Sequence, residues 1–182
     1  QGKLGTQVIA SAELQELGFR ALYPDRFRVI EARIKSALGN RREAMGKIEA
    51  ALSARLAQEG IPARVVSRIK SPYSIYVKMR QEHKSFAQVM DVYGFRVVTD
   101  NVMHCYHALG AVHGLYKPLD GRFRDFVAIP KANGYQSLHT VLFGPFGAPI
   151  EIQIRTEEMD AVAERGVAAH WTYKFGGDSP NS

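Results

Sequence analysis

The connections between the apolar segments of this sequence constrain its fold more than any other feature. Five segments are expected to form strands: 63–67, 92–99, 122–129, 137–143 and 148–155. Helical patterns lie between some of them, but other connections, such as 144–147, are too short for the helical crossover that a parallel pair requires. The sequence therefore predicts an α+β domain with a mixed β-sheet of about five strands flanked by helices, rather than a doubly wound parallel sheet.

Apolar residues at helical spacing occupy much of the remaining chain. Before Pro62 they predict two helices, the first stopped at Gly39-Asn40 and the second running from Arg41 to about Gln58. Further helices are expected over 72–82, 102–116 and 157–173. The chain is therefore expected to divide into an N-terminal helical connector, a domain on which it packs and a flexible tail: residues 1–60, 61–175 and 176–182.

Charge is unevenly distributed along the chain. Residues 61–135 contain eleven Lys or Arg and five Asp or Glu, which accounts for the whole net charge of +6. Such a segment implies an anionic ligand, and charge alone leaves nucleotide phosphates, nucleic acid and an acidic surface open. The single cysteine, Cys105, excludes an internal disulfide and agrees with a cytoplasmic location. No apolar run approaches the ~20 residues that cross a bilayer, so no membrane partner is expected.

Two acidic residues are candidates for chemistry. The polar positions of the strand over 148–155 alternate with isoleucines, and they are Glu151, Gln153 and Arg155. This polar face is either solvated or catalytic. Asp91, just before the strand over 92–99, is either a turn former or a metal ligand. On neighbouring strands, Asp91 and Glu151 would supply the oxygen ligands with which Mg²⁺ bridges phosphates, and Arg96 would suit a phosphate or a base.

Basic residues around the start of the helix over 72–82 suit a phosphate group. Arg68 and Lys70 precede this helix, while Ser74 and Lys78 lie one turn apart on the same helix face. Backbone amides at a helix N-terminus also attract phosphate. The alternative is a solvated basic face without a ligand.

The stretch 122–140 is dense in groups that bind nucleotides. Cationic, amide and ring side chains occur together there: Arg124, Lys131, Asn133, Tyr135, Gln136 and His139. Cations suit phosphates, amides pair with base edges, and flat rings stack on bases. Singly the signals are weaker, because Asn133-Gly134 is also a common turn and a lone histidine is often an ordinary satisfied one.

Familiar nucleotide motifs are absent from the sequence. It contains neither a phosphate loop of the Walker type nor a glycine-rich dinucleotide fingerprint after a strand. It also lacks the adjacent His-Asp pair of metal phosphohydrolases. The residues alone therefore indicate a Mg²⁺-dependent nucleotide-binding α+β domain of some other kind.

Five short motifs follow one another along the chain: Tyr73–Tyr76 with Lys78-Met79, Asp91–Arg96, Gly134–Thr140, Glu151–Thr156 and Gly166–Trp171. In this order they closely resemble the synthetase domain of the RelA/SpoT family. The resemblance runs from about Arg68 to Lys174, more than half of the chain. The helices before Arg68 resemble the connector that precedes this domain in the family.

The resemblance implies a nucleotidyltransferase-like fold, a mixed sheet flanked by helices. The family's reaction moves the β,γ-pyrophosphate of ATP onto the ribose 3′-hydroxyl of GDP or GTP, which yields the alarmone (p)ppGpp of the stringent response and AMP. The implied partners are therefore ATP and GDP or GTP, and the implied cofactor is Mg²⁺.

The resemblance also implies roles by motif position. Asp91 and Glu151 match the metal-binding carboxylates, and Glu151 would also be the general base on the 3′-hydroxyl. The ATP side matches two arginines that sandwich adenine, Arg68 and Arg96, and a phosphate cradle of Lys70, Ser74 and Lys78. On the GDP or GTP side, Tyr135 matches the tyrosine that stacks on guanine. The groups that match positions near this ring are Asn133, Gln136, His139 and Gln153. Lys131 and Arg124 match two cations that face phosphates.

The segment Arg122–Asp125 is basic, which resembles the bifunctional synthetase-hydrolase branch of the family. The family's hydrolase domain precedes the synthetase domain and is not among these residues, so a piece of a bifunctional parent is expected. Control by ribosomes or tRNA would need regulatory regions that are likewise not among them, and an oligomer is compatible with the resemblance.

Two alternatives stay open. The basic central segment would also suit a catalytically silent regulatory or RNA-binding module on the same fold, although such a module has no use for paired carboxylates. A different nucleotidyltransferase on this fold would make a product other than a 3′-pyrophosphate.

Overall fold

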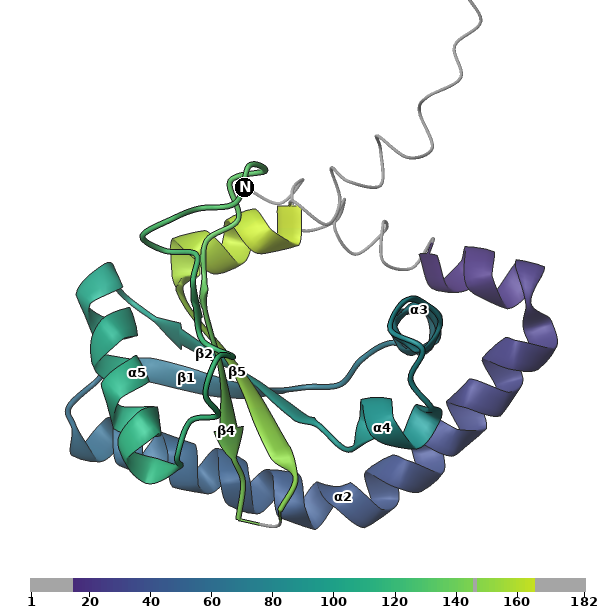
Figure 1. The fold of residues 1–182 in the computed structure, drawn as a ribbon, viewed down its shortest axis with the longest axis horizontal. Helices are drawn as coiled ribbons and strands as arrows, with labels where there is room; N and C mark the ends of the chain where they lie inside the picture. The colour runs from purple at the N-terminus through teal and green to yellow at the C-terminus, as the bar shows by residue number, and fades with distance from the viewer. Residues whose placement is uncertain (1–14, 146, 166–182) are drawn as a thin grey trace, which may run out of the picture.

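The computed structural model describes residues 15–145 and 147–165, and Figure 1 shows its labelled helices and strands. Their bounds are α2 Pro24–Gln58, β1 Ala63–Arg68, α3 Pro72–Gln81, α4 Phe86–Met90, β2 Tyr93–Thr99, α5 Val102–Leu115, β3 Arg124–Asp125, β4 Leu138–Phe143 and β5 Pro149–Thr156. Residues 15–22 and 157–165 are helical as well. Among the described residues, no helix is both long and apolar enough to span a membrane.

The strands form one sheet in the order β1-β2-β5-β4-β3. Only β2 and β5 pair in parallel, while the other three pairs are antiparallel. The parallel pair is joined through α5, β3 and β4, whereas β4 and β5 follow each other across a tight turn. The expected mixed α+β sheet of about five strands is confirmed.

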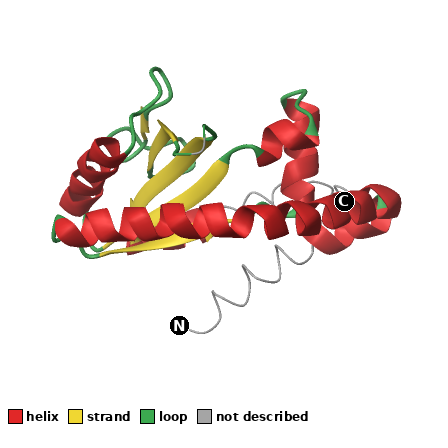
Figure 2. Cartoon of the chain, turned by 90° about the horizontal axis from the view of Figure 1, so that it is seen from below, coloured by secondary structure: helices red, strands yellow, loops and turns green. Residues whose placement is uncertain are grey.

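One face of the sheet is apolar and packs on two helices. Its central strand contributes Ile150, Ile152 and Ile154, all fully buried. They share a hydrophobic cluster with Leu52 of α2 and Val112 of α5. Figure 2 shows α2 lying across the strands. The period-2 alternation of β5 therefore sends its polar side chains to the opposite face.

A second hydrophobic cluster lies on the N-terminal half of α2. Phe19, Ile30 and Ile34 pack there with Ile75 of α3 and Val89 of α4. Figure 1 shows α3 and α4 beside this half of α2, away from α5. The long helix therefore carries the sheet on one half and the α3–α4 pair on the other.

Serine caps start the two short helices. The Oγ atom of Ser71 accepts a hydrogen bond from the backbone N–H of Ser74 at the start of α3 (3.2 Å). At α4, Ser85 and Gln88 each accept from the other's backbone N–H, which forms a capping box. Helix α4 was not expected from the sequence, because five residues are too few to show helical periodicity.

The predicted break at Gly39-Asn40 is wrong. Helix α2 runs without interruption over 35 residues. A glycine in a helix interior costs only about 1 kcal/mol, whereas α2 buries Ile30 and Ile34 in one cluster and Ile48 and Leu52 in the other. Tertiary packing of both halves therefore outweighs the local stop signal.

The strand predicted over 122–129 is also largely wrong, because only Arg124–Asp125 pairs with β4. The carboxylate of Asp125 accepts hydrogen bonds from the backbone N–H groups of Val127 (2.9 Å) and Ala128 (2.8 Å). A side chain that bonds its own backbone in this way turns the chain out of the ladder. The motif at 166–171, the end of the helix predicted over 157–173 and the tail over 176–182 lie outside the described residues.

Candidate functional site

The strand register brings many of the sequence-predicted site residues onto the polar face of the sheet. Arg68 pairs with Gly94, which pairs with Glu151. One row further, Arg96 pairs with Gln153 and Gln153 with His139. Residues opposite each other in neighbouring strands project to the same side. We call this side, with Arg124 opposite His139 at its edge, the polar face.

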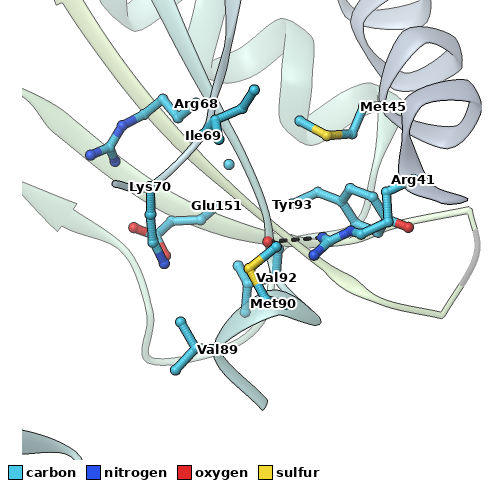
Figure 3. Close-up of a pocket in the computed structure, with 11 residues that line it drawn as sticks. Arg41, Met45, Arg68, Ile69, Lys70, Val89, Met90, Val92, Tyr93 and Glu151 are labelled. Carbon is cyan, nitrogen blue, oxygen red and sulfur yellow. Dashed lines mark hydrogen bonds between the residues drawn. The ribbon is translucent and has the colours of Figure 1, made fainter. Parts of the chain in front are cut away.

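A pocket opens where the polar face meets α2 and the loop after α4. Glu151, Arg68 and Lys70 line one part of it, and Arg41 and Tyr93 line another (Figure 3). The guanidinium of Arg41 lies 4.2 Å from the centre of the Tyr93 ring and donates to the carbonyl oxygen of Val92 (3.2 Å). Helix α2 thus contributes a wall of the pocket that holds the candidate base.

Asp91 is exposed and caps the C-terminal end of α4, two residues before β2. Its neighbours Met90 and Val92 line the pocket, but Asp91 itself is not among the residues that do. Within the described residues, no three His, Cys, Asp or Glu side chains gather as a metal cage. Of the two expected metal-binding carboxylates, Glu151 lines the pocket, and one carboxylate fits Mg²⁺, which is commonly held by one or two carboxylates together with substrate phosphates and water.

Positive groups from β1, α3 and the loop between them crowd together at this pocket. Burial, followed by the neighbouring Lys78 ammonium, lowers the pKa of Lys70 to about 8, and the charge of Glu151 opposes this effect. Burial also lowers the pKa of Arg68, and the next cause is the charge of Arg96. Cations that repel one another at a protein surface are stabilised by an anion, and a polyphosphate provides several charges at once.

A ring platform forms at the other end of the polar face. Tyr135 is half-buried and shares a hydrogen bond of 2.6 Å with Nε2 of His139. Burial, with the nearby charge of Lys131, lowers the pKa of His139 to about 4, so this histidine is neutral at neutral pH. The ammonium of Lys131 lies 5.2 Å and the guanidinium of Arg155 5.6 Å from the centre of the Tyr135 ring. Aromatic rings are the side chains on which bases stack, and nearby cations suit the phosphates of a nucleotide.

Four other predicted site residues form hydrogen bonds within the protein itself. Asn133 accepts from the backbone N–H of Tyr135 (3.1 Å), as its turn signal suggested, and Gln136 donates to the carbonyl of Val127 (3.1 Å). Arg124 is exposed and donates to loop carbonyls, and Ser74 is exposed beside the Ser71 cap. The structure thus does not bring these side chains into the pocket around Glu151.

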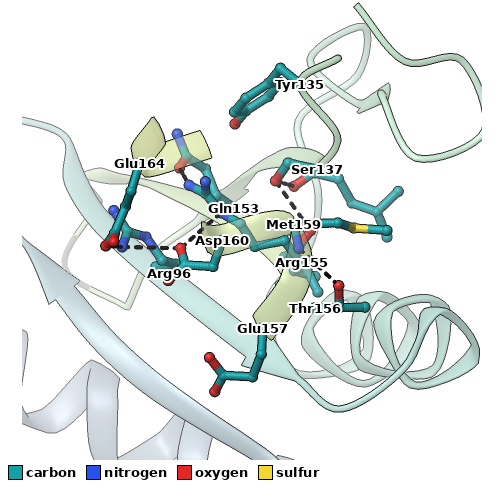
Figure 4. A network of polar contacts seen from close by, with 12 residues as sticks. Arg96, Tyr135, Ser137, Gln153, Arg155, Thr156, Glu157, Met159, Asp160 and Glu164 are labelled. Carbon is teal, nitrogen blue, oxygen red and sulfur yellow. Dashed lines mark hydrogen bonds and ion pairs between the residues drawn. The ribbon is translucent and has the colours of Figure 1, made fainter. Parts of the chain in front are cut away.

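Two residues without an expected role take part in the site, Arg155 and Asp160 (Figure 4). The strand parity already placed Arg155 on the face of Glu151 and Gln153, and the structure adds that it donates a hydrogen bond to Gln153. Asp160 forms an ion pair with Arg96 at 3.2 Å, and nothing in the local sequence points to this contact.

Comparisons with known proteins agree with this geometry. Residues 67–178 match a family model described as the region found in RelA/SpoT proteins. The chain is 55% identical over 167 residues to the bifunctional (p)ppGpp synthase/hydrolase SpoT of Escherichia coli K12, covering 92% of this chain and 24% of that protein. It is 44% identical over 180 residues to the GTP pyrophosphokinase rsh of Brucella melitensis, covering 99% and 24%.

Among solved structures, the small alarmone synthetase 1 from Bacillus subtilis is similar with a TM-score of 0.61 and 26% identity. The match covers 80% of this chain and 82% of that chain. The chain spans about a quarter of the length of the curated relatives it matches.

Proposed function

This chain belongs to the RelA/SpoT family, and from that premise we propose that it transfers the β,γ-pyrophosphate of ATP to the ribose 3′-hydroxyl of GDP or GTP. The products are (p)ppGpp and AMP. The observation that carries the proposal is the register of the sheet. It sets Arg68, Glu151, Arg96 and His139 on one polar face, with a cationic pocket at one end and a ring platform at the other.

The cationic pocket is the donor half-site in this proposal. Arg68 and Arg96 are near enough for their charges to interact, and their flat guanidinium groups suit an adenine between them. Lys70 and Lys78 lie beside them and would hold the ATP phosphates. Their charge offsets the negative charge that develops as the pyrophosphate moves. Ser74 would join this cradle through the amide end of α3.

The ring platform is the acceptor half-site. Tyr135 would stack on guanine, and the neutral His139 holds the tyrosine hydroxyl. Gln153 lies opposite His139 in the sheet. The remaining acceptor groups, Lys131, Arg124, Asn133 and Gln136, would contact the guanine nucleotide from the loop over 122–140, with the two cations toward its phosphates.

Glu151 lines the cationic pocket, and its charge also acts on His139 of the ring platform. It is the proposed general base. It would take the proton of the 3′-hydroxyl as that oxygen forms a bond to the β-phosphorus of ATP. The bond from this phosphorus to the α,β-bridging oxygen breaks, and AMP leaves with that oxygen. The proposed cofactor is Mg²⁺, held by Asp91 and Glu151 with the ATP phosphates, and it would offset phosphate charge when bound. The proposed location is the cytoplasm, where both nucleotides occur.

The test is a nucleotide assay with purified protein, ATP, GDP and Mg²⁺. We expect ppGpp and AMP in equal amounts, and we expect Glu151→Gln to lower kcat at least about 100-fold because the base is lost. Glu43→Gln is the matched control, since Glu43 is exposed on α2 and pairs only with Lys47 among the described residues. Salt-sensitive RNA binding without any AMP release would favour the silent RNA-binding module instead.

A further inference from the structure

Three arginines from three strands converge on the carboxylate of Asp160. Arg64 of β1 lies 3.6 Å away, Arg96 of β2 lies 3.2 Å away, and Arg155 of β5 lies 3.5 Å away. Asp160 is 6% exposed and Arg155 is 4% exposed, so solvent screens these charges weakly. Figure 4 shows Asp160 with Arg96 and Arg155, and Glu164 beside Arg96.

Two of these arginines lie at different ends of the polar face. Arg96 lies at the donor half-site, where its charge reaches Arg68. Arg155 lies under the ring of Tyr135 and donates to Gln153, both at the acceptor half-site. One buried carboxylate therefore contacts a cation from each half-site. Arg64, the third, is paired with Glu157 at 2.9 Å and contacts neither half-site in the described residues.

Charge rather than hydrogen-bond geometry holds the arginines to Asp160. Within the described part of the chain, the Nε atoms of Arg96 and Arg155 and the Oδ1 atom of Asp160 are buried without a hydrogen-bond partner. Burial lowers the pKa of Arg155, and the charge of Arg96 lowers it further, while the charge of Asp160 opposes this. Without the carboxylate, the guanidinium groups of Arg96 and Arg155 would repel one another and move apart.

Resting on the proposed function, we infer that Asp160 is a positioning residue that sets Arg96 for the ATP base and Arg155 for the Tyr135 platform. It contacts no nucleotide in this role. Because one residue serves both half-sites, its loss weakens the binding of ATP and of GDP together, whereas the base Glu151 and the chemical step are left in place.

Asp160→Asn tests this inference, because asparagine keeps the size of aspartate and removes its charge. We expect the KM values for ATP and for GDP each to rise about tenfold, with kcat within about twofold of wild type. Calorimetric titration with GDP alone and with a non-hydrolysable ATP analogue alone should show the same two losses without turnover. Asp160→Glu keeps the negative charge and should therefore bind ATP and GDP more tightly than Asp160→Asn but more weakly than wild type. If Asp160→Asn does not fold, Asp160→Glu is measured in its place.

Glu157→Gln is the matched control, because Glu157 lies on the same helix and, among residues 15–145 and 147–165, pairs with Arg64 only. Its KM values should stay at those of wild type. A rise confined to one nucleotide, a loss of kcat alone, or an Asp160→Asn variant equal to wild type would each overturn the inference. A wild-type protein that makes no ppGpp would instead overturn the proposed function.

Discussion

Lys70 lies beside a second lysine at the pocket, and this arrangement makes its charge sensitive to pH near neutrality. The groups that face it are Lys78 on α3, Arg68 on β1 and Glu151 on β5. Burial and the two cations disfavour its protonated form, while Glu151 favours it. With a pKa of about 8, Lys70 holds its proton below that pH and loses it above.

We therefore expect ATP to bind more weakly as the pH rises from about 7 to about 9, because the protonated fraction of Lys70 falls across that range. Bound phosphate favours the protonated form, so ATP binding near pH 8 should take up protons. Titration calorimetry in buffers of different ionisation enthalpy measures both effects. Lys70→Arg keeps its charge throughout and should flatten the pH dependence; an equally steep profile in that variant would assign the effect to another group.

Helix α2 connects the pocket to residues outside the stretch that matches the family model. Arg41 belongs to α2, and its stacking on Tyr93 fixes the start of β2 beside the pocket. The geometry of that wall depends on α2 passing unbroken through Gly39, where a local stop was expected. A Cβ atom added at Gly39 would meet nothing within 4 Å.

Gly39→Ala should therefore stabilise the protein by about 0.5–1 kcal/mol, since alanine loses less backbone entropy in a helix interior. Urea unfolding followed by circular dichroism measures the change. Gly60→Ala is the matched control, because Gly60 has a φ of +69° after the end of α2 and alanine is strained there. It should destabilise the protein. A loss of stability in Gly39→Ala would mean that α2 is bent or broken at this position.

At the scale of the whole molecule, the site depends on two hydrophobic clusters that share α2. The sheet cluster holds Glu151 through its neighbours Ile150 and Ile152. The second cluster holds α3, which carries Lys78, through the fully buried Ile75. The donor half-site thus combines groups held by different cores.

We expect Ile75→Ala to cost about 2–5 kcal/mol of local stability and to free α3 and α4 more than the sheet. Hydrogen exchange should speed up over residues 72–90, while the amides of β2 and β5 keep their protection. Leu52→Ala, in the sheet cluster, should by contrast raise exchange in the strands. Equal acceleration everywhere in Ile75→Ala would show that the molecule opens as one cooperative unit.

Features that depend on neighbours along the chain could be predicted before the fold was known. The alternation of isoleucine with Glu151, Gln153 and Arg155 determined the two faces of β5, because successive strand residues point to opposite sides. The short connections determined that the sheet is mixed. The order of the five short motifs, from about Arg68 to Lys174, indicated the family, and the family model that matches residues 67–178 confirms it.

Only the tertiary structure decided the features that depend on contacts between distant segments. Strand order and register placed Arg68 and His139 on the face of Glu151, and no local pattern carries that information. Packing on two hydrophobic clusters keeps α2 helical across Gly39-Asn40. Hydrogen bonds from the backbone to the Asp125 side chain end β3 after two residues. The three ion pairs of Asp160 also depend on contacts between distant segments. The strands of the three arginines meet it only in the folded chain, where the buried carboxylate lies within 3.6 Å of all three guanidinium groups.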